Sequence, residues 1–196
     1  MCYFMTLALC QACSFGLIDS FPCALCQPNH NLSASLLSEV ADISYNATKK
    51  VHYYGIKFSV LINDRGFPID CVVTPASVSD GMVAFELLEN NPLSVIYGNQ
   101  GYVDKPVKSH LSQSGIQLIS QLRNYSWFDN CRINRLRKPI ETVFSSLDQF
   151  EIGCLRCRNL QTLSFRTEAI LLNYSLMLES SHNGFGVTLK YSRAYT

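Results

Sequence analysis

Two acidic residues of this 196-residue chain stand where a divalent cation could be bound. Asp19 ends a short apolar run at residues 15–19, FGLID, whose pattern predicts a buried strand. Glu141 lies in a predicted helix, shortly after four cations: Arg132, Arg135, Arg137 and Lys138. A strand end and a facing helix can offer carboxylates to Mg²⁺, which favours a few carboxylates, water and phosphate oxygens. A turn aspartate and a solvated helix-start glutamate would explain the same residues, so spacing alone leaves both interpretations open.

Cysteine pairs are the second feature that could carry chemistry. Three Cys-x-x-Cys pairs occur in the chain: Cys10/Cys13, Cys23/Cys26 and Cys154/Cys157. The first two pairs have the four thiolates that a tetrahedral zinc site needs. The nine residues between them include the predicted strand, however, which would pull the pairs apart, so we expect small buried side chains instead. An odd total of nine cysteines favours a reducing, cytoplasmic setting over a disulfide framework.

Composition predicts one ordered domain. Hydrophobic residues make up 47% of the chain and charged residues only 16%, which is below the roughly 25% of average domains. The net charge of +1 argues weakly against a nucleic-acid partner. This near-neutral total conceals a basic segment, because residues 123–166 carry eight Lys and Arg against four Asp and Glu. The longest apolar run is shorter than the ~18 residues of a membrane-spanning helix, so no membrane contact is expected.

The pattern along the chain predicts a mixed α/β fold. A strand is expected at 15–19, and Pro22 would end it. A hairpin is expected from a strand at 52–63, a turn at 64–66 and a second strand at 67–74. Residues 27–50 are polar and without periodicity. A helix should follow from about Asp80, read as its N-cap, and then a strand at 94–97, a helix at 105–113 and a strand at 116–122. Pro139 should occupy the first turn of a helix, and a last helix should span 160–178. Alternating strands and helices indicate a sheet flanked by helices.

A series of short motifs occurs in a characteristic order, and together they resemble the catalytic domain of the DDE-type transposases encoded by bacterial insertion sequences. The motifs are IDSFP (18–22), KKVHYYGIKF (49–58), NDRG (63–66), VTPASVSD (73–80), YGNQGY (97–102), GIQLISQLRN (115–124) and RKPIETVFSSLDQF (137–150). The ordered series is far more specific than any one of its members. It divides the chain into residues 1–14, a remnant of a preceding region, the catalytic domain at 15–178 and a C-terminal tail at 179–196.

The resemblance implies a ribonuclease-H-like core with a mixed five-strand sheet flanked by helices. It also implies three acidic residues that hold two divalent metals, usually Mg²⁺, for phosphodiester hydrolysis and strand transfer at the DNA ends of the element. By position, Asp19 is the first acid and Glu141 the third, and both would be metal ligands. The second acid belongs to a Gly-Asp-Lys-Gly-Tyr motif, which in this chain reads Gly98-Asn99-Gln100-Gly101-Tyr102.

Asn99 is the departure with the largest chemical consequence. A neutral amide offers one carbonyl oxygen where a carboxylate offers two charged ones, so we expect metal binding to be impaired. Other departures agree with this expectation, since only about 14 residues precede the first strand and Ser59 stands where the family often has histidine. We therefore interpret the chain as a truncated and degenerate transposase that is inactive in DNA transposition.

Two alternative functions remain from the sequence. The chain could be a non-enzymatic remnant that binds DNA through Arg132, Arg135, Arg137 and Lys138, or that forms oligomers with itself or with a full-length transposase. The less favoured alternative is a small zinc module built from Cys10, Cys13, Cys23 and Cys26.

Overall fold

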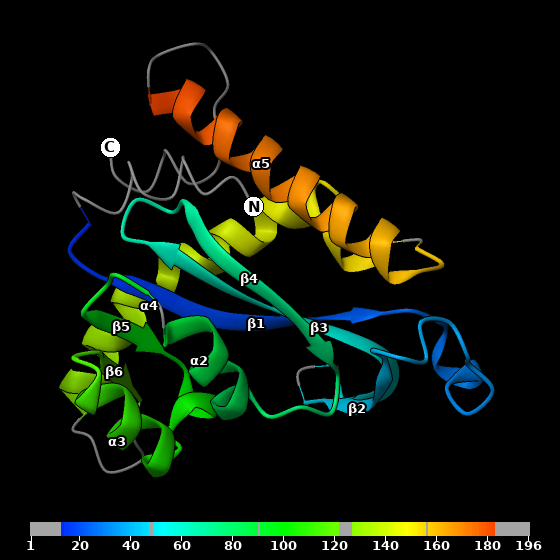
Figure 1. Ribbon diagram of the computed structural model, residues 1–196, viewed down its shortest axis with the longest axis horizontal. Helices are drawn as coiled ribbons and strands as arrows, with labels where there is room; N and C mark the ends of the chain where they lie inside the picture. The colour runs from blue at the N-terminus through cyan, green and yellow to red at the C-terminus, as the bar shows by residue number, and fades with distance from the viewer. Residues whose placement is uncertain (1–12, 48, 90, 122–126, 156, 183–196) are drawn as a thin grey trace.

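The computed structural model describes residues 13–182 except 48, 90, 122–126 and 156, and the side chains of residues 154, 181 and 182 are also left undescribed. A six-stranded mixed sheet forms its centre, and helices cover both faces (Figure 1). The strand order is β2-β3-β1-β5-β6, and β4 pairs with β3. No helix in the described part of the chain is long and apolar enough to cross a membrane.

The long strand β3 (Val51–Asn63) organises half of the sheet. Along one edge it pairs antiparallel with β1 (Gly16–Ala24) over its residues 55–63. Along the other edge it pairs first with β2 (Asp42–Asn46) and then with β4 (Pro68–Pro75). The predicted hairpin is confirmed: Gly66 takes a positive φ of 87° in the turn between β3 and β4, a conformation that glycine adopts without strain.

Strand β1 is longer than its sequence predicts. The apolar pattern predicts a strand at 15–19 that Pro22 would terminate, yet β1 continues to Ala24. The reason is its pairing, because β5 (Val95–Gly98) joins β1 only at Gly16 and Leu17. Beyond that point one edge of β1 has no strand partner in the described sheet, and proline, which cannot donate a backbone hydrogen bond, is tolerated there.

Strand β2 is not predicted by the sequence pattern, and it brings the sheet to six strands where five are expected. Its side chains are mostly exposed, so no apolar alternation marks it in the sequence. Pairing with β3 orders it. The same polar segment, for which only irregular structure is expected, also contains the short 3₁₀ helix η1 (Pro28–His30).

The following elements agree with the predicted order. Helix α2 (Asp80–Leu88) precedes β5, and α3 (Lys105–Gln113) precedes β6 (Gln117–Ser120), which pairs parallel with β5. A short 3₁₀ helix, η2 (Gln100–Tyr102), links β5 to α3. One detail differs, because Ser79 is the N-cap residue of α2 and Asp80 is the first helical residue.

Two long helices complete the domain. Helix α4 (Trp127–Asp148) starts twelve residues before Pro139, so the prediction that Pro139 opens this helix was wrong. A proline inside a helix removes one backbone hydrogen bond, and the apolar residues on both sides of it hold the helix to the sheet: Ile133, Ile140, Val143 and Leu147 are all buried. The 3₁₀ helix η3 (Ile152–Cys154) then leads to α5 (Leu160–His182).

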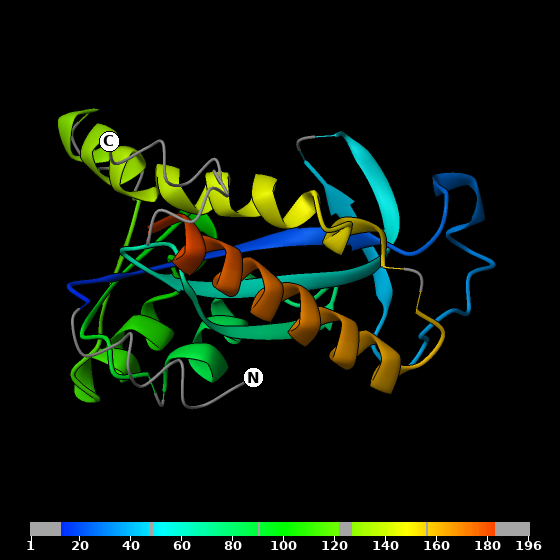
Figure 2. The same cartoon turned by 90° about the horizontal axis from the view of Figure 1, so that it is seen from above.

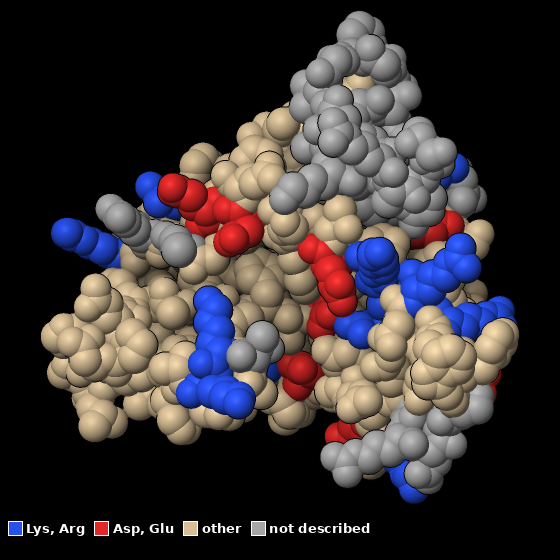
Figure 3. Space-filling model, turned by 180° about the vertical axis from the view of Figure 1, so that it is seen from behind, with Lys and Arg blue, Asp and Glu red and all other residues tan. Residues whose placement is uncertain are grey.

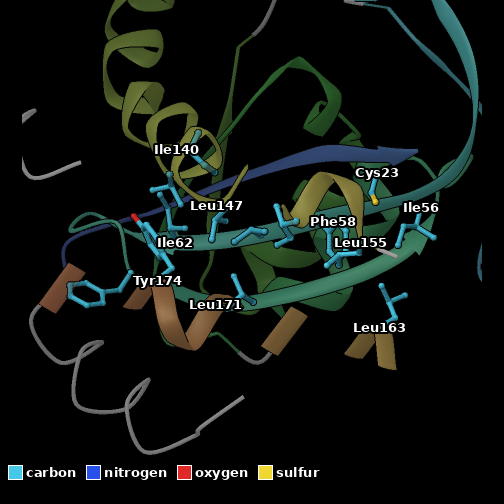
Figure 4. Close-up of a cluster of buried hydrophobic side chains, with 14 of the residues drawn as sticks. Cys23, Ile56, Phe58, Ile62, Ile140, Leu147, Leu155, Leu163, Leu171 and Tyr174 are labelled. Carbon is cyan, nitrogen blue, oxygen red and sulfur yellow. The ribbon is translucent and has the colours of Figure 1, made fainter. Parts of the chain in front are cut away.

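The helices divide between the two faces of the sheet (Figure 2). Helices α4 and α5 pack on the face that carries Leu17, Phe58 and Ile62, and Figure 4 shows the buried side chains of this larger core. Helices α2 and α3 pack on the opposite face, against Ile18 and Leu61. Neighbouring residues of β1 therefore point to opposite helical layers, as the alternation of side chains along a strand requires.

Candidate active site

Asp19 lies in the middle of β1, on the face covered by α4, and only 9% of its surface is exposed. Three donors surround its carboxylate. Oδ1 accepts hydrogen bonds from the backbone N–H of Ser20 at 2.9 Å and from Nδ2 of Asn99 at 2.7 Å. Oδ2 pairs with Nη2 of Arg137 at 2.6 Å. The carboxylate is thus fully engaged by groups of the protein itself.

Asn99 reaches Asp19 because β5 ends beside β1. The two strands are parallel neighbours, and Asn99 follows Gly98, the last residue of β5. The side-chain Oδ1 of Asn99 accepts from the backbone N–H of Gly101 at 2.6 Å, so this side chain caps η2. With its oxygen held by that N–H, the amide must present its NH₂ group to Asp19, because the reverse orientation would place an oxygen against the carboxylate.

Helix α4 delivers Arg137 to the site and leaves Glu141 outside it. Arg137 is expected among the DNA-contacting cations; instead it is 8% exposed and forms an ion pair with Asp19. Glu141, one turn later, is exposed and has no hydrogen bond or ion pair with any described residue. The structure therefore brings Asp19 and Asn99 together, and the residue of α4 that contacts Asp19 is Arg137 instead of the expected Glu141.

Burial and charge act in opposite directions on Asp19. Burial raises the pKa of its carboxyl group above the ordinary value, and the Arg137 guanidinium lowers it. The hydrogen bond from Ser20 also lowers this pKa, and the negative charge of Asp80 raises it. The net direction is upward, so desolvation outweighs the ion pair. This is the expected balance for a buried charge with one cationic partner.

Asp80 and Lys57 form a second ion pair that sequence reasoning does not assign to the site. Asp80 Oδ1 lies 2.8 Å from Lys57 Nζ and accepts a hydrogen bond from Ser20 Oγ at 3.0 Å. The side chains of Ser20 and Lys57 point away from α4, toward the layer of α2. The sequence pattern indicates only a helix cap for Asp80, and its place in the VTPASVSD motif is the one other signal. The Asp19–Arg137 pair thus lies on the α4 side of β1 and the Lys57–Asp80 pair on the α2 side. Asp80 contacts Ser20, the residue that follows Asp19.

Tyr102 closes the site on the side of α2. Its side chain is 1% exposed, and burial together with Asp80 and Asp19 raises the pKa of its hydroxyl well above the ordinary value. Little space for a side chain exists at the neighbouring Gly101, because a Cβ atom there would stand 2.6 Å from Asp80 Oδ2 and 2.9 Å from Asn99 Oδ1. These two oxygens consequently converge on one point above Gly101.

A groove of about 780 Å³ runs past the Lys57–Asp80 ion pair and Asn99. Its walls come from β1, the β2–β3 turn and the end of α4. The lining residues that bear on the site are Ser20, Lys57, Asp80, Asn99 and Asp148. The groove thus reaches the second ion pair and the amide of Asn99.

The residues present do not fit the divalent metal that the family resemblance implies. A metal ion needs oxygen lone pairs directed at it, whereas N–H groups occupy both oxygens of Asp19 and the oxygen of Asn99. Asp19 and Asp80 each already have a cation beside them. Among the described residues, no three His, Cys, Asp or Glu side chains are grouped so that they could hold a metal.

The cysteines expected for a zinc module lie apart along β1. Cys13 precedes the nine-residue strand and Cys26 follows it, and a strand of this length extends roughly 30 Å. Cys23 is buried in the core on the α4 side of the sheet. Cys10, the fourth proposed ligand, is outside the described residues, as are most of the expected remnant at 1–14 and most of the tail at 179–196.

Comparisons with known proteins agree with this fold. The family model described as "Transposase DDE domain" matches residues 9–159. A solved structure, the cryo-EM structure of a piggyBac transposase synaptic complex with hairpin DNA, superposes with a TM-score of 0.50 at 12% identity, over 90% of this chain and 49% of that one. The chain thus spans about half the length of that transposase, and at this identity the likeness shows the fold alone. A search of curated protein sequences finds no match. The family match covers most of the sequence, and the chain belongs to the family of DDE transposase domains.

Proposed function

We propose that this chain is a transposase-family protein of DNA transposition that has lost metal-dependent phosphodiester cleavage. The family normally uses a divalent metal for this reaction. One observation carries the proposal: Asp19 has a hydrogen bond from Asn99 and an ion pair with Arg137, so no free carboxylate edge remains for a metal ion. Hydrolysis of a phosphodiester without a bound metal would lack both the activated water and the stabilised leaving oxygen.

A cleavage assay tests this proposal. The purified chain is incubated with a supercoiled plasmid that carries the DNA flanking its own gene, with Mg²⁺ or with Mn²⁺. We expect no nicking above that of the Asp19→Ala variant, which controls for a contaminating nuclease. Metal-dependent nicking that disappears in both Asp19→Ala and Glu141→Ala would contradict the proposal.

DNA binding without cleavage is the second candidate function, and the surface of α4 favours it. Arg132, Arg135 and Lys138 are exposed on this helix. Figure 3 shows Lys and Arg side chains gathered over the first half of α4, with acidic side chains beside them. Exposed cations on one helix can contact successive phosphates and release counterions. Arg137 is excluded from this surface because it is buried against Asp19.

Matched charge variants test the DNA-binding surface. The triple variant Arg132→Gln, Arg135→Gln and Lys138→Gln removes three exposed cations from α4. The control, Lys50→Gln, Arg65→Gln and Lys105→Gln, removes three exposed cations elsewhere on the chain. We expect the first variant to lower the slope of log affinity against log salt by about one for each phosphate that is no longer neutralised, and the control to leave it unchanged. Equal decreases in both variants would show that only net charge matters.

A further inference from the structure

The region around Asp19 is already neutral without any bound ion. Its two buried or half-buried carboxylates each have one cationic partner: Arg137 for Asp19 at 2.6 Å, and Lys57 for Asp80 at 2.8 Å. In a typical divalent-metal site several carboxylates face each other, and the ion supplies the missing positive charge. In this chain two side chains of the protein supply that charge.

The two cations differ in what they hold in place. Lys57 is on β3 and also donates to the backbone oxygen of Val78, so it stays within the sheet and the α2 layer. Arg137 instead crosses from α4 to β1, and it comes from the helix that also carries Glu141. The pair joins residues 118 positions apart in the sequence. Arg137 is therefore the group that binds α4 to the acidic position of β1.

The position of the Arg137 guanidinium explains how it can stand in for a metal ion at Asp19. Its Nη2 atom lies on Oδ2, the one oxygen of Asp19 that no other described donor occupies. Arginine remains charged at every pH the protein meets. Any cation approaching Asp19 on this side would meet a fixed positive charge within a few ångströms, and such repulsion is large where water is excluded.

We propose that Arg137 is a built-in cation that takes the place of a divalent metal at Asp19, and that restoring the acid at residue 99 does not by itself restore metal binding. Replacement of Asn99 by aspartate would add one negative charge beside Oδ1 of Asp19, but the Arg137 guanidinium would still occupy Oδ2. A metal site should open only when the charge at residue 137 is removed as well. This inference goes beyond the proposed loss of DNA cleavage, because it concerns ion binding by the free protein.

Four proteins test it without any DNA: the unchanged chain, Asn99→Asp, Arg137→Gln and the double variant Asn99→Asp/Arg137→Gln. Mn²⁺ binding is measured by electron paramagnetic resonance, and thermal unfolding is followed with and without Mn²⁺. We expect the double variant to bind Mn²⁺ at least about tenfold more tightly than Asn99→Asp does, because the removed charge lay directly beside the ion. The unchanged chain should show neither binding nor a shift in melting temperature.

Asn99→Asp/Arg137→Lys is the matched control, since it keeps the positive charge at residue 137 and should bind Mn²⁺ no better than Asn99→Asp. If the double variant is unfolded without metal, Mn²⁺ should restore its circular dichroism spectrum, because binding to the folded state alone stabilises that state. Tight Mn²⁺ binding by Asn99→Asp would overturn the inference, as would a double variant that neither binds Mn²⁺ nor refolds with it. Either result can occur whether or not the chain cleaves DNA, so the two proposals fail separately.

Discussion

The side-chain amide of Asn99 donates a hydrogen bond to Asp19 across 2.7 Å. An aspartate in the same place would bring two carboxylates to within that distance, and like charges so close require a proton or a cation between them. Asparagine removes this requirement. The carboxylate of Asp19 is held by protein groups alone: Ser20, Asn99 and Arg137.

The ion pair between Asp19 and Arg137 should be strongly non-additive in stability. Arg137→Leu leaves a buried carboxylate without a cation, and we expect it to lower the free energy of unfolding by about 3 kcal/mol or more. Asp19→Asn/Arg137→Leu removes both charges and should recover most of that stability. Urea unfolding of Asp19→Asn, Arg137→Leu and the double variant measures how far the two effects on the free energy of unfolding depart from additivity. Equal destabilisation by Arg137→Leu and by the double variant would show that the pair is not coupled.

Replacement of Ser59 by alanine should stabilise the folded protein. It lies in β3 with no exposed surface, and its Oγ has no hydrogen-bond partner among the described residues. A buried polar group without a partner is unfavourable by about 1–3 kcal/mol, so Ser59→Ala should raise the melting temperature. Ser146→Ala is the control, because the buried Oγ of Ser146 donates to the Thr142 carbonyl and no gain is expected. A lower melting temperature for Ser59→Ala would contradict the prediction.

A side chain added at Gly101 should destabilise the protein. The Cβ atom of Gly101→Ala would approach Asp80 Oδ2 and Asn99 Oδ1 too closely, and relieving such a clash typically costs about 1–3 kcal/mol. We expect a lower free energy of unfolding in urea. Gly115→Ala provides a comparison, because it has open space around it but a φ of 80°, and its cost should be only about 1 kcal/mol of backbone strain. A Gly101→Ala variant as stable as the unchanged chain would argue against the described packing of Asp80 on η2.

The described cysteines should differ sharply in reactivity. Burial raises the pKa of the Cys71 thiol to about 12, with the charge of Asp70 adding to the shift, whereas Cys131 is exposed. The thiolate is the reactive form, so at pH 8 Cys71 should stay unmodified while Cys131 is alkylated. Cys23 and Cys157, both buried, should also be protected. Peptide mass mapping after brief alkylation measures this order, and early modification of Cys71 would contradict it.

Local patterns were sufficient for much of the fold. Turn residues and β-branched runs predicted the β3–β4 hairpin, and helix start and stop residues predicted α2 and α3 close to their observed bounds. The last helix begins at the expected Leu160 but ends four residues later than expected, at His182. Where the strand predictions failed, pairing between strands had decided the outcome. Strand β2 has little apolar signal and forms on the edge of β3, and β1 passes through Pro22 because its outer edge there has no strand partner in the described sheet.

By itself the sequence determined the order of every helix and strand except β2 and the short 3₁₀ helices, the family, and the identities of the residues at positions 19, 99 and 141. Those properties depend on residue type and on spacing along the chain. Only the tertiary structure decided that Arg137 reaches Asp19 while Glu141 stays exposed, and that Lys57 holds Asp80 beside Ser20. Each of these contacts joins segments far apart in the sequence. Which side chain of a helix meets a strand depends on how the helix packs on the sheet, and no local pattern records that packing.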